Sequence, residues 1–204
     1  MAATHGFPFY DALGTALKGG ALVRQGHREA GLGFLRQGLS ALYDIGTKPA
    51  PHWLVWQADF YGHAEQAHVG LELLEEAMAQ ADDTGNLHAV AELYRLKGEF
   101  LNVSSAAEPG DIEHCFLKAL AVARQQQAMM LELRAAMSLS RFQRSQGQYH
   151  ASRDLLASVY DGFTERFDTA DLEEAKTLLE ELSICVSSEP RSSSSGAFLG
   201  HEGR

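Results

Sequence analysis

Residues 91–101 read AELYRLKGEFL, and their apolar side chains return every three or four positions. This is the period of an α-helix that buries one face. The same period runs through most of the chain, whereas strand-like alternation and turn-bounded runs rich in Val, Ile and Thr are missing from the sequence. The sequence therefore predicts an all-α protein.

Small residues in this stretch and in three others form a repeat with a period near 40 residues. Antiparallel helices approach closely only where no bulky side chain holds their axes apart, so these residues are candidate packing positions. In the first helix of each pair they are Gly19, Ala58, Gly98 and Ser140. In the second helices they are Gly31, Gly70, Ile112 and Ser152, followed seven residues later by Gly38, Ala77, Ala119 and Val159. We assign repeat packing to Gly19, Gly31, Ala58, Gly70, Ala77, Gly98, Ala119, Ser140 and Ser152.

A helical hairpin cannot bury both of its faces alone, so each pair is expected to lean on the next and to build an open superhelix. The sequence predicts an α-solenoid of about four hairpins plus a C-terminal capping helix. Glycine, proline and capping residues predict helices at about 11–25, 28–44, 51–64, 66–82, 87–103, 111–127, 129–146, 149–161 and 169–182.

Three segments follow from this interpretation. Residues 1–10 form an N-terminal lead-in, and residues 11–182 form the repeat domain. Residues 183–204 are rich in serine and poor in large apolar side chains, so we expect a disordered tail. Phe7, Phe9 and Tyr10 lie at the front of the array, where they suit either a missing upstream neighbour or self-association.

The order of small and large residues in each pair resembles the tetratricopeptide repeat (TPR), although the usual TPR period is shorter, about 34 residues. Five strings carry a narrower resemblance: HGFPF (5–9), RQGLSAL (36–42), AELYRLKGEFL (91–101), LELRAAMSLSR (131–141) and FDTADLEEAKTLLEEL (167–182). They are similar to the C-terminal TPR region of bacterial signalling proteins, in which an adenylate or guanylate cyclase-like domain and a predicted ATPase precede the repeats. The sequence lacks a Gly-x-x-x-x-Gly-Lys-[Ser/Thr] phosphate loop, so the resemblance implies no cyclase or ATPase activity for this chain.

Charge and cysteine content bear on partners and location. A formal net charge of −10 repels nucleic acid and anionic lipid, and no apolar run is long enough to span a membrane. Cys115 and Cys185 lie far apart in sequence, so we expect reduced thiols in the cytoplasm.

Catalytic and metal chemistry find little support in the residue pattern. His63 and His68 are five residues apart, whereas zinc-binding histidines on one helix face are four apart. Cys115 lies on a predicted buried face and is expected to behave as a small hydrophobe. We therefore assign no catalytic residue, no metal ligand and no cofactor, and we expect the chain not to be an enzyme.

The candidate binding surface is the inner wall formed by the first helices. Offsets from the small residues place on it Asp59, Glu92, Arg95, Glu99, Asn102, Arg134, Arg141 and Arg144. Such a wall, acidic in the middle and basic late, would hold an extended peptide or a helix of a protein partner. Two other interpretations stay open: these side chains are simply solvated, or the groove senses a small effector.

Overall fold

The computed structural model describes residues 7–47, 50–84, 88–104, 107–164 and 169–188, and within these ranges every regular element is an α-helix. The helices are α1 (Pro8–Arg24), α2 (Arg28–Asp44), α3 (Pro51–His63), α4 (Ala67–Thr84), α5 (Val90–Ser104), α6 (Pro109–Gln125), α7 (Met129–Ser145), α8 (Tyr149–Tyr160) and α9 (Ala170–Ser188). The predicted all-α class is confirmed. No described helix is both long and apolar enough to cross a membrane.

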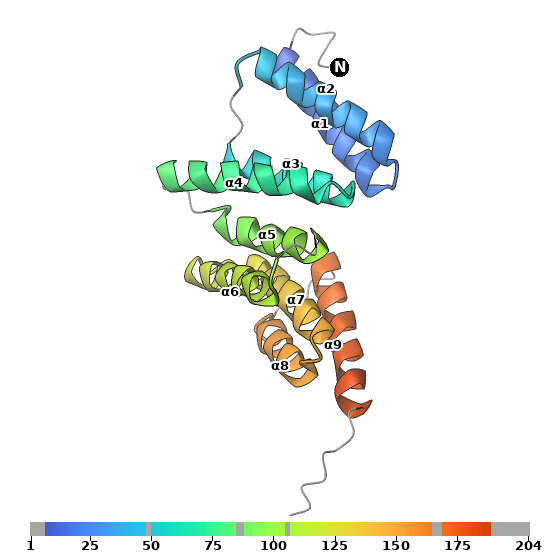
Figure 1. The fold of residues 1–204 in the computed structure, drawn as a ribbon, viewed down its shortest axis with the longest axis vertical. Coiled ribbons are helices and arrows are strands. Elements are labelled where there is room, and N and C mark those ends of the chain that lie inside the picture. Colours follow the sequence, from blue (N-terminus) through green and yellow to red (C-terminus); the bar gives the residue numbers. More distant parts are fainter. Residues whose placement is uncertain (1–6, 48–49, 85–87, 105–106, 165–168, 189–204) are drawn as a thin grey trace, which may run out of the picture.

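The helices stack as successive hairpins (Figure 1). The pairs α1/α2, α3/α4, α5/α6 and α7/α8 follow one another along the molecule, and α9 packs against α7 and α8. The first helices of the hairpins, α1, α3, α5 and α7, also contact one another in series, and α9 contacts α7, so these five helices form one continuous wall. Buried apolar residues gather in three successive clusters rather than around one centre. This arrangement is the predicted α-solenoid.

The first hairpin is held by contact between backbones. A Cβ atom added to Gly19 would lie 2.3 Å from the backbone nitrogen of Leu35, and one added to Gly38 would lie 2.3 Å from that of Ala16. An added Cβ at Gly31 would meet the backbone nitrogen of Val23 at 2.7 Å. No larger side chain fits at these positions, and α1 and α2 approach there as closely as the period predicts.

Later hairpins use their small residues differently. Added Cβ atoms at Gly62 and Gly70 would lie 2.3 and 2.5 Å from the ring of Phe100, and one at Gly98 would lie 2.6 Å from the ring of Phe116. The glycines of these hairpins therefore leave room for aromatic rings. The expectation had been that they let a neighbouring helix backbone approach. The remaining packing residues, Ala58, Ala77, Ala119, Ser140 and Ser152, are all fully buried.

The inserted rings have a period of their own. Phe60, Phe100 and Phe142 lie two residues after the small residue of α3, α5 and α7. Phe60 fills the space beside Gly20 of the preceding hairpin, and Phe142 packs on Phe116 of the preceding hairpin with ring centroids 6.0 Å apart. Each of these rings therefore joins one hairpin to the hairpin before it.

The ends of the helical array lie outside the predicted limits of 11 and 182. Helix α1 begins at Pro8, because proline is well suited to the first turn of a helix. Helix α9 runs on to Ser188, and the hydroxyls of Ser183 and Ser187 donate hydrogen bonds to carbonyls four residues earlier. Residues 183–188 of the predicted tail are therefore helical, whereas residues 189–204 of the tail and 1–6 of the predicted lead-in 1–10 lie outside the described residues.

Candidate functional site

The wall of helices α1, α3, α5, α7 and α9 borders an open cavity of about 470 Å³. All five helices of the wall contribute to it: α1 through Arg24, α3 through Asp59, α5 through Arg95, α7 through Arg141 and α9 through Glu174. Because the helices of successive hairpins line one space, the cavity exists only in the assembled solenoid.

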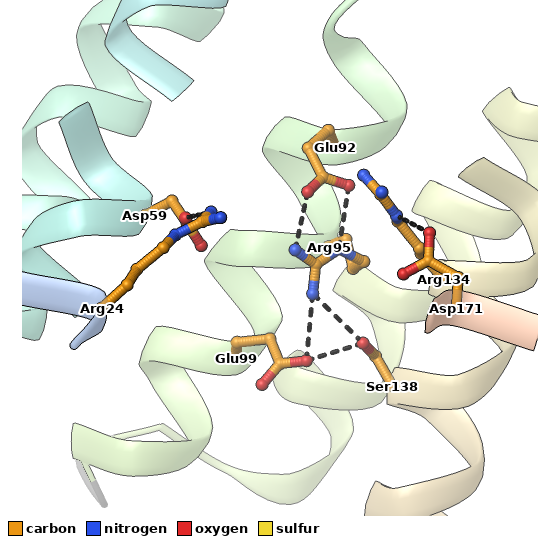
Figure 2. Close-up of polar contacts among 8 residues, drawn as sticks. All are labelled: Arg24, Asp59, Glu92, Arg95, Glu99, Arg134, Ser138 and Asp171. Atoms are coloured by element: carbon orange, nitrogen blue, oxygen red, sulfur yellow. Dashed lines mark hydrogen bonds and ion pairs between the residues drawn. The ribbon is translucent and has the colours of Figure 1, made fainter. Parts of the chain in front are cut away.

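Arg95 on α5 lies at the centre of a polar network (Figure 2). Its Nε and Nη2 donate to the two carboxylate oxygens of Glu92 at 2.9 and 2.6 Å, and its Nη1 donates to Glu99 Oε1 at 3.2 Å. Ser138 on α7 donates its hydroxyl to the same Glu99 oxygen at 2.6 Å, which joins α5 to α7. Burial by itself lowers the pKa of Arg95, but hydrogen bonds to Glu92 and the charges of Glu92, Glu99 and Asp59 raise it above its ordinary value. The guanidinium therefore stays charged in a region of negative potential.

Ion pairs connect the first helices at both ends of the cavity. Arg24 on α1 pairs with Asp59 on α3. On the other side, Arg134 Nε lies 2.8 Å from Asp171 Oδ2 of α9. Side chains from sequence-distant helices therefore meet as charge pairs across the wall.

The basic stripe expected late in the wall is neutralised by α9. Besides the Arg134 pair, Arg141 Nη2 lies 2.5 Å from Glu174 Oε1, and Arg144 pairs with Glu181. The wall does not become basic toward its end, because α9 lies on α7 with its acidic side chains toward these arginines.

The residues predicted for the wall lie in three places. Asp59, Glu92, Arg95, Arg134 and Arg141 line the cavity. Glu99 lies beside it and holds Arg95 and Ser138, whereas Arg144 lies outside the lining and pairs with Glu181. Asn102 is exposed near the end of α5 and does not line the cavity.

Further lining residues were missed by sequence reasoning: Arg24, Trp56, His63, Asp171 and Glu174. A signal for Trp56 was present, because it lies two residues before Ala58, as Ser138 lies two residues before Ser140. Arg24 and His63 share an offset of five residues from Gly19 and Ala58. Helix α9 carries no comparable small-residue marker, so nothing in the repeat pattern pointed to its carboxylates.

The lining suits recognition of charged groups. Four arginines and four carboxylates line the described part of the cavity, and each of these arginines contacts a carboxylate. Trp56 adds an aromatic surface that is 50% exposed. No group of three or more His, Cys, Asp or Glu side chains in the described ranges is placed to hold a metal ion.

Comparison with known proteins agrees on the fold. No family model and no curated protein matches the chain. A crystal structure of nearly identical TPR-like repeats, from a kinesin light chain candidate of Podosopora anserina, aligns with a TM-score of 0.60 over 91% of this chain and 99% of that chain. The two sequences are 15% identical, so the likeness shows the fold alone. The chain thus has a TPR-like solenoid fold.

Proposed function

We propose that the protein is a non-catalytic scaffold that docks a protein partner on the inner wall of its solenoid. The observation that carries this proposal is a cavity lined by all five helices of the wall. A surface assembled from successive repeats offers an extended ligand several adjacent contacts, and its charged side chains give such contacts specificity. The setting we propose is cytoplasmic bacterial signalling, which rests on the sequence resemblance described above.

Sensing of a small effector is the second candidate. A cavity of about 470 Å³ lies within the range of ligand pockets, about 300–1,000 Å³. Such pockets are mostly apolar, however, whereas charged side chains dominate this lining. The chemistry of the lining therefore favours a protein segment over a small molecule.

We also propose self-association through the N-terminal end, and one observation supports it. Phe7 and Tyr10 are exposed at the start of α1. Phe9, in contrast, packs on Trp53 of the next hairpin, with ring centroids 5.9 Å apart. Phe7 and Tyr10 are thus the more accessible rings for contact with a second copy. Sedimentation of a Phe7→Ser/Tyr10→Ser double variant against the wild type tests the proposal.

Site-specific photo-crosslinking tests the scaffold function. A benzophenone amino acid replaces Trp56 in the cavity, or Leu117 on α6 as a control, because these two side chains are equally accessible, 50% and 48% exposed. We expect a protein crosslink in cells at position 56 that weakens when His63→Trp narrows the cavity, and no such crosslink at position 117. Equal capture at both positions would contradict the proposed docking site. The effector alternative would be supported by a metabolite that raises the melting temperature of the wild type but not of the His63→Trp variant, in the absence of a protein crosslink.

A further inference from the structure

We propose, building on the docking function, that the segment bound in this cavity is basic: an extended stretch of a partner protein whose Lys or Arg side chain stacks on Trp56 and meets Asp59. Trp56 and Asp59 both line the cavity and lie three residues apart on α3, so they share one helix face. A cation over the exposed indole ring would therefore lie beside a carboxylate. Tryptophan is the aromatic residue that binds cations best.

The molecule already contains such a site, occupied by its own arginine. The guanidinium of Arg24 pairs with Asp59 and lies over the ring of Phe60, with its central carbon 5.5 Å from the ring centroid. The Arg24 side chain is 57% exposed, whereas that of Asp59 is only 19% exposed. An exposed cation on a half-buried carboxylate can be displaced by a competing cation, because exposed ion pairs are weak.

The lining itself is neutral, with four arginines and four carboxylates, and the negative charge that favours a cationic ligand comes from Glu99 and from the chain as a whole. The lining arginines each contact a carboxylate, and Glu99 adds a further carboxylate beside the lining, with its side chain 38% exposed. The net charge of −10 would also speed the approach of a basic segment.

Peptide binding to the full chain tests whether the ligand is positively or negatively charged. The probes are two blocked peptides, Ac-GRGKGRGKG-NH2 and Ac-GEGDGEGDG-NH2, titrated by calorimetry and by tryptophan fluorescence. We expect the basic peptide to bind and to change the fluorescence, and its affinity to fall as salt exceeds about 0.15 M. We expect Trp56→Ala to weaken binding about fivefold, since a cation–π contact contributes on that scale.

The Arg24→Gln variant distinguishes a basic ligand from an acidic one, because it frees Asp59 and removes one positive charge from the cavity rim. For a basic ligand this change strengthens binding, whereas for an acidic ligand it weakens binding. Arg153→Gln is the matched control: it removes the same charge from an exposed arginine of α8 that pairs with its neighbour Asp154, outside the cavity lining. We expect the control to leave the affinity for the basic peptide within about twofold of wild type.

The outcomes are distinct from those of the crosslinking experiment. Binding of the acidic peptide that Arg24→Gln weakens would overturn the basic-ligand proposal and leave the docking site intact. Failure of both peptides to bind would also overturn it, whereas only the crosslink at position 56 reports on docking itself. Basic-peptide binding that Trp56→Ala and Arg24→Gln leave unchanged would place the peptide elsewhere and reject the assigned site.

Discussion

The hydroxyl of Ser140 on α7 donates a hydrogen bond to the backbone carbonyl oxygen of Ser152 on α8, at 2.9 Å. Both serines are completely buried. They occupy in the fourth hairpin the repeat positions that Gly19 and Gly31 occupy in the first, where backbone meets backbone. The fourth hairpin thus joins its helices at the same level through a side-chain hydrogen bond, which satisfies the buried hydroxyl.

Removal of this hydroxyl should weaken the fourth hairpin. We expect Ser140→Ala to lower the free energy of unfolding by about 1 kcal/mol, the typical contribution of one buried hydrogen bond. Ser158→Ala is the control, because the exposed Ser158 hydroxyl donates only to the carbonyl of Leu155 in its own helix. Urea unfolding followed by circular dichroism measures both; equal stability losses would show that the Ser140 bond has no special role.

Glycine substitutions in α1 should have opposite effects at two positions. Gly19→Ala places a Cβ against the backbone of α2, so the helices must move apart, and we expect a loss of about 2–3 kcal/mol. Gly14→Ala meets nothing within 4 Å and should raise stability by about 0.5–1 kcal/mol through helix propensity. Thermal unfolding of the two variants checks the difference, and a neutral Gly19→Ala would argue against close backbone contact.

Substitutions of Phe100 and of Gly70, whose missing side chain leaves space for the Phe100 ring, should be energetically coupled. Phe100→Ala removes a buried ring between two hairpins and should cost about 3–5 kcal/mol. Gly70→Ala should destabilise the wild type, because its Cβ would lie 2.5 Å from the ring, yet it should be neutral or stabilising once Phe100 is alanine. A double-mutant cycle in urea measures the coupling. Additive changes in the free energy of unfolding would mean that the Phe100 ring and the space at Gly70 are not coupled.

The two cysteines should differ in reactivity. Burial raises the pKa of Cys115, and Asp111 raises it further against an opposing effect of Lys97. At any pH near neutrality the reactive thiolate is therefore scarcer at Cys115 than at an ordinary cysteine. We expect iodoacetamide to modify the partly accessible Cys185 first and Cys115 only when the chain unfolds. Mass spectrometry of Cys185→Ser and Cys115→Ser variants checks this, and rapid labelling of Cys115 in the folded chain would refute it.

The repeat positions could be predicted because close packing leaves a local trace in the sequence. Gly19, Ala58, Gly98 and Ser140 keep their period, since each lies in a buried contact with a neighbouring helix where a large side chain would not fit. The aromatic rings of Phe60 and Phe100 carry the same period, and they would have been found by extending the alignment two residues past each small position. That Gly70 accommodates a ring could not be inferred from glycine itself, because an absent side chain does not identify what fills its space.

The sequence predicted which helices and residues form the binding wall, but it did not predict how their charges pair. Asp59, Glu92 and Arg95 follow from the repeat offsets, because residues on one helix face keep a constant spacing. The partner of Arg134 is Asp171, separated from it by 37 residues. Which carboxylate meets which arginine depends on how α9 lies across α7, and no local spacing encodes that placement.

From the order of its residues alone, this chain specifies helices, their pairing and an open stack, because periodic apolar and small side chains act over one or two helical turns. The neutral charge balance of the cavity, the network around Arg95 and the exposure of Trp56 arise when distant helices come together. Electrostatic interactions depend on distances between side chains that are far apart in sequence, and only the packed solenoid sets those distances.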